Sequence, residues 1–219
     1  MNRLSPLAKG GAVGVIMVLL SGITSIGQTD SSTVSYRLEK IGVVQCDFGT
    51  ALPAAKMDGM DELDFRVGRS GDFHFIFYEP GKICRLDSGG KLIRSVSTGA
   101  PLSRRNCGFA LSPGGDLFVL DGRGKNLYSY DASLDLIGKY PLAGGEDLDP
   151  VFGLAATSWG DLLAAGGLKS NIWKLEPEGK SFSAKPVYLP ESYRYSFLSE
   201  MEGRKLVATD PLGALMVMD

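Results

Sequence analysis

The sequence predicts an all-β protein in which one small sheet of antiparallel strands is repeated along the chain. A glycine followed by a polar residue recurs at steps of 44, 45 and 43 residues, at Gly71, Gly115, Gly160 and Gly203. An acidic residue lies 15 positions after each of these polar residues, at Asp87, Asp131, Glu176 and Asp219. No apolar stripe of helical period continues after Thr29. The pattern predicts tandem β units and almost no helix.

Each unit divides into short strands in the same order. The first strand precedes the glycine and is expected at residues 63–67, 109–111, 153–156 and 195–198. A more apolar second strand follows the glycine, at 73–77, 117–120, 162–165 and 205–208. Third strands are expected at 83–86, 127–130, 172–175 and 215–218, and fourth strands at 92–96, 136–140 and 186–189. Four short antiparallel strands in a unit of about 40–50 residues are typical of β-propeller blades, which bury their faces against one another.

One unit carries a family resemblance. Residues 112–131 (SPGGDLFVLDGRGKNLYSYD) resemble the NHL repeat and related six-bladed propeller sequences. The matching positions are Gly115, Asp116, Phe118, Val119, Asp121, Asn126, Tyr130 and Asp131. The resemblance extends over residues 63–219 and implies blades at 63–106, 107–151, 152–194 and 195–219. It implies no particular activity, because this superfamily includes enzymes, sensors and scaffolds.

The visible units do not complete a six-bladed ring, which would need roughly 260 residues at this period. Two arrangements are open. Residues 34–44 (VSYRLEKIGVV) have strand character and could supply the missing outer strand of the last blade, closing a four-bladed ring. Alternatively, the blades form an incomplete, open arc. We favour the arc, because the units resemble six-bladed families, and an open arc exposes blade faces that would bind a partner.

The N-terminal residues have the pattern of a signal peptide or an N-terminal anchor. Positive residues, an apolar run and small residues before a cleavage point follow in the expected order: Arg3 and Lys9, residues 11–20, then Ser25 and Gly27. This segment covers residues 1–27, and residues 28–62 would form an N-terminal strand and connector. We expect an exported protein, periplasmic or extracellular, or one anchored by the uncleaved segment.

Composition and cysteine spacing narrow the classes of partner and site. The chain has 219 residues and a formal net charge of −2, so a nucleic-acid partner is not implied. Its three cysteines, Cys46, Cys84 and Cys107, have no CxxC spacing. They therefore do not indicate a zinc or redox motif. At most one pair could form a disulfide, and we expect small buried apolar side chains.

Candidate ligand-binding residues lie in loops that connect second to third strands or successive blades. In propellers such loops surround one mouth of the central channel. The glycine-rich loop at 121–126 could hold an anion or a sugar hydroxyl, and a pair of arginines could grip a carboxylate. The candidates are Asp121, Arg123, Asn126, Lys169, Asn171, Asp210, Arg104 and Arg105. The competing interpretation is that these are solvated loops whose Asp and Asn side chains bond their own backbone.

No catalytic or metal-binding residue is predicted. Glu146, Asp147 and Asp149 lie close together and could bind calcium, but their spacing is not that of an EF-hand. The repeated acids after the third strands are interpreted as turn-forming. His74 is the only histidine, so it cannot build a multi-histidine zinc site. Its place in a strand between two phenylalanines predicts that it points outward or toward a neighbouring blade.

We expect an exported, non-enzymatic binding module without a cofactor, which binds a partner protein, a peptide or a glycan on its loop face. The alternatives are a calcium-dependent propeller hydrolase or lactonase acting on a small molecule, and a truncated propeller without independent function. The resemblance implies that lactonases of the superfamily hold calcium with acids and amides around the channel, a set that Asn126, Asn171 and Asp210 would imitate only loosely. The single histidine and the lack of a coherent acidic ring favour the binding module.

Overall fold

The structure, a computed structural model, consists almost entirely of β-strands. It describes residues 14–20, 24–25, 36–37, 40–47, 63–78, 81–99, 102, 106–121, 125–167, 171–188, 197–201, 205–209 and 215–218. The helical content of these residues is one short 3₁₀ turn, η4 (Glu146–Leu148), and the single 3₁₀ residue Asn106. Nowhere in the described part of the chain is there a helix long and apolar enough to cross a membrane. The predicted all-β class is confirmed.

The strands form antiparallel sheets in chain order. The first blade contains β5 (Leu63–Val67), β6 (Phe73–Phe77), β7 (Lys82–Leu86) and β8 (Leu92–Ser97). The second contains β9 (Cys107–Leu111), β10 (Leu117–Asp121), β11 (Asn126–Tyr130) and β12 (Leu136–Ala143). The third contains β13 (Val151–Ala156), β14 (Leu162–Gly166), β15 (Asn171–Glu178) and β16 (Ser181–Tyr188). The fourth contains β17 (Phe197–Met201), β18 (Lys205–Thr209) and β19 (Leu215–Met218).

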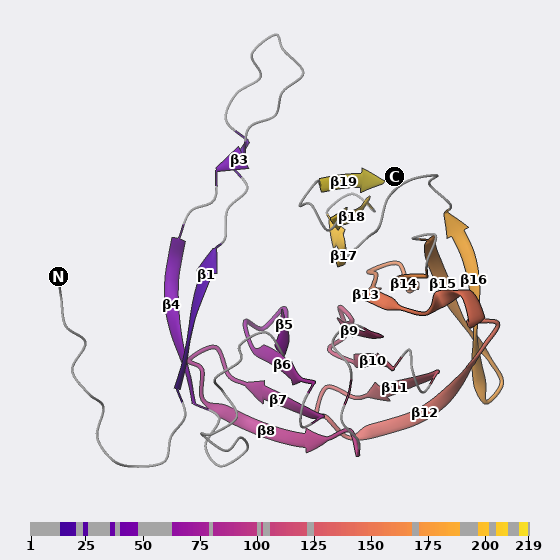
Figure 1. The fold of residues 1–219 in the computed structure, drawn as a ribbon. Coiled ribbons are helices and arrows are strands. Elements are labelled where there is room, and N and C mark those ends of the chain that lie inside the picture. The colour runs from indigo at the N-terminus through magenta and orange to yellow at the C-terminus, as the bar shows by residue number, and fades with distance from the viewer. Residues whose placement is uncertain are drawn as a thin grey trace, which may run out of the picture.

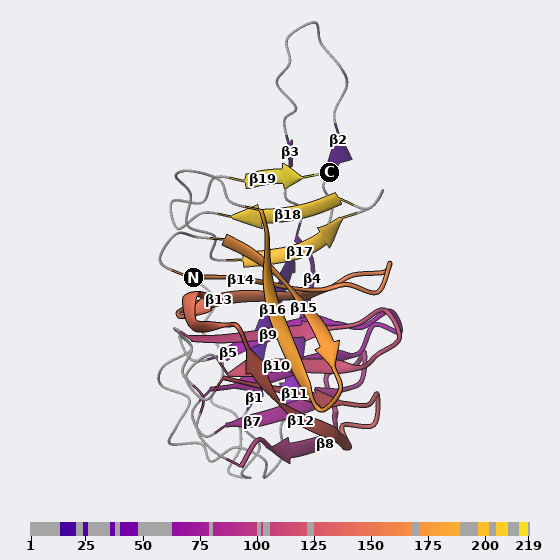
Figure 2. The ribbon, with the colours of Figure 1, turned by 90° about the vertical axis from the view of Figure 1, so that its right-hand side faces the viewer.

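The blades are arranged as an arc around a common centre. Figure 1 shows β5, β9, β13 and β17 toward the centre, with β8, β12 and β16 at the periphery. In the side view of Figure 2, the outer strand β16 faces the viewer. The outer strands of the second and third blades also pair in parallel, Leu142 with Phe182 and Ala143 with Ser183. Two blades therefore share one eight-stranded sheet.

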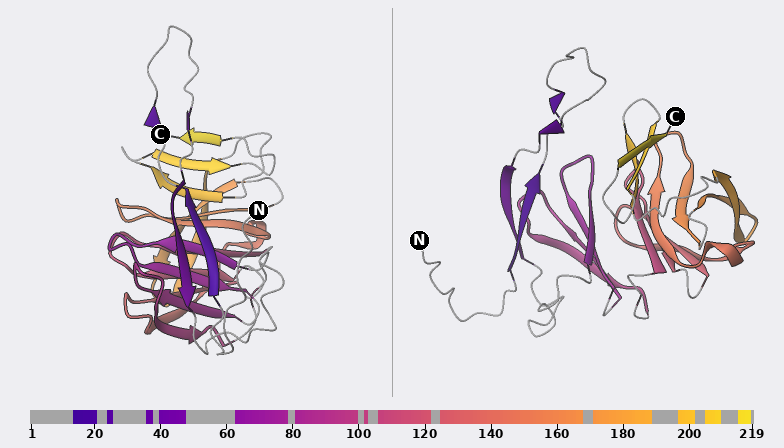
Figure 3. Two further views of the ribbon diagram at one scale, coloured as in Figure 1. Left: turned by 90° about the vertical axis from the view of Figure 1, so that its left-hand side faces the viewer. Right: turned by 45° about the horizontal axis from the view of Figure 1, so that its top comes forward.

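The segment considered for ring closure lies elsewhere. Strand β4 (Lys40–Asp47) pairs antiparallel with β1 (Gly14–Leu20), beside the first blade in Figures 1 and 3. Two short strands that lie between β1 and β4 in the chain, β2 (Thr24–Ser25) and β3 (Tyr36–Arg37), also pair with each other. Within the described residues β19 pairs only with β18. The closed four-bladed alternative is therefore wrong for this structure, and the favoured open arc is confirmed; cleavage within residues 1–27 stays a prediction.

The backbone conformation of one turn explains why glycine recurs. Gly71, Gly115 and Gly160 have φ angles of +80°, +96° and +94°, a region that residues with a Cβ rarely adopt. Each closes a tight turn in which its N–H donates to a carbonyl three residues earlier, at Gly68, Ser112 or Thr157. The same turn joins the first and second strands of three blades, so the glycine recurs.

Of the repeated acids that the structure describes, those of the first two blades share one role. Asp87 Oδ1 accepts hydrogen bonds from two backbone N–H groups of the following turn, and Asp131 Oδ1 does the same. The turn-forming interpretation is wrong for Glu176, which lies inside β15 and pairs with Lys185 at 2.7 Å. Because β15 continues to Glu178, the outer strand of this blade begins at Ser181, earlier than expected. Asp219 lies outside the described residues.

Apolar side chains fill the space between neighbouring blades. One cluster joins Ile76 and Ile83 of the first blade to Phe109 and Leu117 of the second. Two further clusters join the second blade to the third and the third to the fourth. Both faces of a blade are used. In β14, Leu162 and Ala164 pack toward the second blade, whereas Leu163 and Ala165 pack toward the fourth.

The described cysteines behave as small apolar residues. Cys84 and Cys107 are free and buried. Burial raises the pKa of the Cys84 thiol to about 12 and also raises the pKa of Cys107, so both remain protonated and unreactive at neutral pH. The expectation of buried apolar cysteines is confirmed for these two, and the side chain of Cys46 lies outside the described part.

A buried polar cluster also joins the first two blades. The Asp72 carboxylate accepts hydrogen bonds from His74 Nε2 at 2.7 Å, from Arg85 Nε at 2.8 Å and from the Ser70 hydroxyl. Arg85 Nη1 reaches across to the Ala132 carbonyl at 2.6 Å. The inter-blade position expected of His74 is therefore confirmed.

The cluster fixes the charge state of its members. Burial raises the pKa of Asp72, but the hydrogen bonds from Ser70, His74 and Arg85 outweigh it and bring the pKa to about 2. An ionised Asp72 keeps the proton of the imidazole on Nε2. Burial lowers the pKa of His74, and Asp72 opposes this only in part. The imidazole is neutral, and its buried Nδ1 has no hydrogen-bond partner among the described residues.

We expect Gly108→Ala to lower the free energy of unfolding by about 1–3 kcal/mol, the usual cost of overpacking a core. A Cβ at Gly108 of β9 would lie 2.7 Å from Leu154 Cβ and 3.3 Å from the Gly153 backbone of β13. Urea unfolding measures the change. Gly114→Ala is the matched control, since its nearest neighbour would be Ser112 Oγ at 3.6 Å. Equal stabilities of the two variants would contradict the close packing of these inner strands.

We expect the free energy of unfolding to fall as the pH is lowered from 7 to 5.5. Unfolded His74 takes up a proton near its ordinary pKa of about 6.5, whereas burial keeps folded His74 neutral at lower pH. The proton therefore stabilises the unfolded chain, with a slope of at most about 1.4 kcal/mol per pH unit. Urea unfolding at a series of pH values measures this slope.

His74→Gln is the control, because its amide can still donate to Asp72 but does not titrate. Since His74 is the only histidine, the slope should disappear in this variant. A wild-type protein that gains stability toward pH 5.5 would show instead that His74 is charged and paired with Asp72.

Candidate functional site

A cavity of about 380 Å³ lies between the four inner strands, β5, β9, β13 and β17. The C-terminal ends of β5, β9 and β13 and the middle of β17 each contribute to its wall. Its apolar lining consists of Val67, Ala110, Leu111, Pro113, Leu154, Ala155, Ala156 and Leu198. Polar side chains are supplied by Arg66, Arg69, Ser112 and Glu200. The cavity thus combines an apolar floor with charged groups at its edge.

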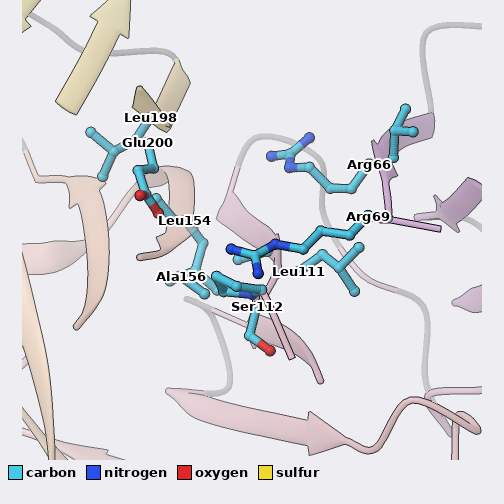
Figure 4. A pocket seen from close by; sticks show the side chains of 13 residues that line it. Arg66, Arg69, Leu111, Ser112, Leu154, Ala156, Leu198 and Glu200 are labelled. Carbon is cyan, nitrogen blue, oxygen red and sulfur yellow. The ribbon is translucent and has the colours of Figure 1, made fainter. Parts of the chain in front are cut away.

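The charged groups stand on opposite sides. Figure 4 shows Arg66 and Arg69 reaching from one side of the cavity toward Glu200 and Leu198 on the other. The two arginines come from the first blade, and Glu200 comes from the fourth. The cavity therefore depends on blades that are far apart in the sequence.

Arg66 is held in place by its neighbours. Its Nη1 donates to Asp64 Oδ1 at 2.8 Å and to the Phe65 carbonyl at 2.8 Å. Its guanidinium carbon lies 5.6 Å from the centre of the Phe109 ring, a cation–π distance. These contacts fix the guanidinium against the second blade and partly neutralise its charge.

Arg69 is less constrained. It lies in the turn between β5 and β6 and is exposed. Among the residues that the structure describes, no carboxylate or carbonyl is bound to its guanidinium. A guanidinium presents a planar fork of donors that matches a carboxylate or phosphate. Arg69 is therefore the group of the cavity best able to take an anion from outside.

Glu200 links the third and fourth blades. Its carboxylate accepts hydrogen bonds from the backbone N–H and the hydroxyl of Ser158. Two guanidiniums and one carboxylate line the cavity, and Asp64 already balances the charge of Arg66.

A second cavity of about 220 Å³ adjoins the first, between the first two blades. Asp72, His74 and Arg85 of the buried cluster line it, together with Ser70 and Ala132. It shares five lining residues with the larger cavity: Gly68, Arg69, Leu111, Ser112 and Pro113.

The residues predicted from the sequence lie away from both cavities or outside the described part. Asp121 and Asn126 form the terminal pair of β10 and β11, and Asp121 pairs with Cys107 at the start of β9, the opposite end of that strand from Leu111. Asn171 occupies the corresponding place in the third blade, paired with Gly166, and its side chain is not described. Five predicted residues fall outside the described part: Arg104, Arg105, Arg123, Lys169 and Asp210. Ligand binding by this group stays a prediction.

The acidic loop has a structural role. Asp149 Oδ1 accepts a hydrogen bond from Asn106 Nδ2 at 2.6 Å, and Asn106 Oδ1 accepts one from Val151 N–H at 2.7 Å. These bonds join the starts of the second and third blades. Across the described residues no group of three or more His, Cys, Asp or Glu side chains could hold a metal ion.

The sequence analysis missed Arg66, Arg69 and Glu200. A signal was present for Arg66. Counted back from the repeated glycine, its position is taken by Ala110, Ala155 and Leu198 in the other units. A charged residue at an inner-strand position where the other units have apolar ones indicates a group facing the channel.

No protein-family model and no curated protein matches this chain. Solved structures do match it. A streptogramin B lyase is 16% identical with a TM-score of 0.54, over 81% of this chain and 61% of the lyase. Virginiamycin B lyase from Staphylococcus aureus is 12% identical with a TM-score of 0.54, over 94% and 74%. The WD40 β-propeller domain of Doa1 is 16% identical with a TM-score of 0.51, over 71% and 50%.

These likenesses concern the fold alone, because the identities are low. The chain spans about 61% of the length of the streptogramin B lyase. Lyases and a WD40 domain share the arrangement of blades seen here. The expected resemblance to β-propellers is confirmed: the chain is a partial β-propeller, an open arc of antiparallel blades.

Proposed function

We propose that this protein is an exported, non-enzymatic binding module that holds an anionic segment of a partner protein or peptide in the larger cavity. The observation that carries the proposal is the exposed Arg69 guanidinium at the edge of an apolar floor. A charge-assisted, bidentate bond to a carboxylate would anchor the ligand. Apolar groups beside that carboxylate would then cover Val67, Leu111 and Ala156, lining residues that keep exposed surface.

The cavity differs in place from the loops favoured by the sequence. It lies on the face formed by the turns between first and second strands. Its volume of about 380 Å³ suits a short segment of two or three side chains. Peptides suit this lining better than glycans, because the hydroxyl groups of a glycan would lie against apolar side chains without hydrogen-bond partners.

An enzymatic role is the alternative. Matched structures include a lyase and a putative gluconolactonase, which share only the fold with this chain. A calcium-dependent hydrolase would need acids and amides gathered around the channel, and the charged groups that line this cavity are mainly arginines. The binding module is therefore the better-supported function.

We expect Arg69→Gln to weaken the binding of short Leu/Ala/Glu peptides about tenfold or more, since a hydrogen bond to a charged group contributes about 1.5–3 kcal/mol. Binding should also weaken as salt is raised, because the anchor is partly exposed. Fluorescence anisotropy with labelled peptides measures both effects.

Lys180→Gln is the matched control, because it removes one positive charge from an exposed turn that does not line the cavity. Its affinity should equal that of the wild type. Equal affinities of the Arg69→Gln variant and the wild type would overturn the proposed site. Binding of neutral oligosaccharides but of no peptide would overturn the proposed class of ligand.

A further inference from the structure

The two adjoining cavities form one composite site, and we propose that it recognises the free carboxyl-terminal end of a peptide. This inference rests on the proposed function and names the part of the ligand that is read. Arg69 and four neighbours line both cavities, so the guanidinium stands at their junction. A ligand anchored on Arg69 would have groups in both spaces.

The hydrogen bonds of the three arginines around the composite site show which of them can bind the carboxylate of a ligand. Arg66 is bonded to Asp64 and to the Phe65 carbonyl. Arg85 is bonded to Asp72 and to the Ala132 carbonyl. Both guanidiniums serve the fold. Arg69 has no comparable protein acceptor within the described part, so it is the one that can receive the ligand's carboxylate.

The smaller cavity selects the last side chain by size and polarity. Three of the residues that line it are small: Gly114, Gly115 and Ala132. Its volume of about 220 Å³ is several times the roughly 30 Å³ that a water molecule occupies in the liquid, enough for a small side chain. The Ser112 hydroxyl, the Asp72 carboxylate and the His74 imidazole line it as well. A serine-sized side chain, whose hydroxyl can bond to such groups, therefore suits it better than an apolar one.

Because Arg69 lies next to the smaller cavity, the site suits the C-terminal residue of a peptide better than an internal Asp or Glu. In a C-terminal residue the carboxylate and the side chain leave the same Cα, so one can reach Arg69 while the other enters the smaller cavity. In an internal Asp or Glu the carboxylate is the end of the side chain, and no group remains to fill the smaller cavity. The residues before the terminus would lie over Val67 and Ala156 in the larger cavity.

The test compares three short Leu/Ala/Glu peptides by fluorescence anisotropy with the full chain. The first ends in serine with a free carboxyl, the second is its C-terminal amide, and the third ends in tryptophan with a free carboxyl. We expect the first to bind at least tenfold more tightly than either of the others. In Arg69→Gln the acid and the amide should bind equally weakly.

A cavity-filling variant tests the smaller space separately. An added Cβ at Gly115 would lie 3.2 Å from Ala132 Cβ, so the Ala132 side chain faces this wall. Ala132→Leu should remove the preference for terminal serine over tryptophan. Ser133→Leu is the matched control, because Ser133 is exposed and does not line the cavity. Equal thermal unfolding of the two variants shows that both are folded.

The outcomes separate the two proposals. If acid and amide bind equally to the wild type while Arg69→Gln weakens both, the proposed function stands and terminal recognition is overturned, with internal glutamate as the anchored group. If Arg69→Gln changes no peptide's affinity, the proposed function fails as well. If Ala132→Leu keeps the preference for serine, the smaller cavity does not read the last side chain and the inference is overturned.

Discussion

Burial of apolar blade faces against neighbouring blades is the constraint on which this structure depends. A single four-stranded sheet of this size cannot bury two apolar faces alone, so each blade needs a neighbour. Alternation along β14 shows the consequence: Leu162 and Ala164 pack toward one blade, and Leu163 and Ala165 pack toward the other. The parallel pairing of β12 with β16 adds backbone hydrogen bonds to this packing between the second and third blades.

The polar groups between the first two blades bond to one another, except that His74 Nδ1 has no partner among the described residues. Asp72 collects hydrogen bonds from Ser70, His74 and Arg85, and Arg85 continues to a carbonyl of the next blade. Such a network costs less than an unpaired buried charge and fixes how two blades sit against each other. It also lines the smaller cavity, so the contact that joins two blades also shapes the space beside Arg69.

The strands were predictable because their causes are local. Alternating side chains set the strands, and a positive φ requires glycine at Gly71, Gly115 and Gly160, so the units could be aligned from the sequence. Errors arose where local patterns were ambiguous. Glu176 occupies the place of a turn-forming acid, but the pairing of β15 with β16 continues past it to Glu178. Residues 34–44 had strand character, but strand character alone does not choose a partner, and β4 pairs with β1.

The sequence by itself determined the all-β class, the order of strands within each blade and the tandem repeat, because turns and alternation act over a few residues. Only the tertiary structure decided the open arc and the site. Arg66, Arg69 and Glu200 come from the first and fourth blades and face one cavity because the inner strands surround it. No local sequence pattern predicts that these three residues lie close together, since their proximity depends on how successive blades rotate about a common centre.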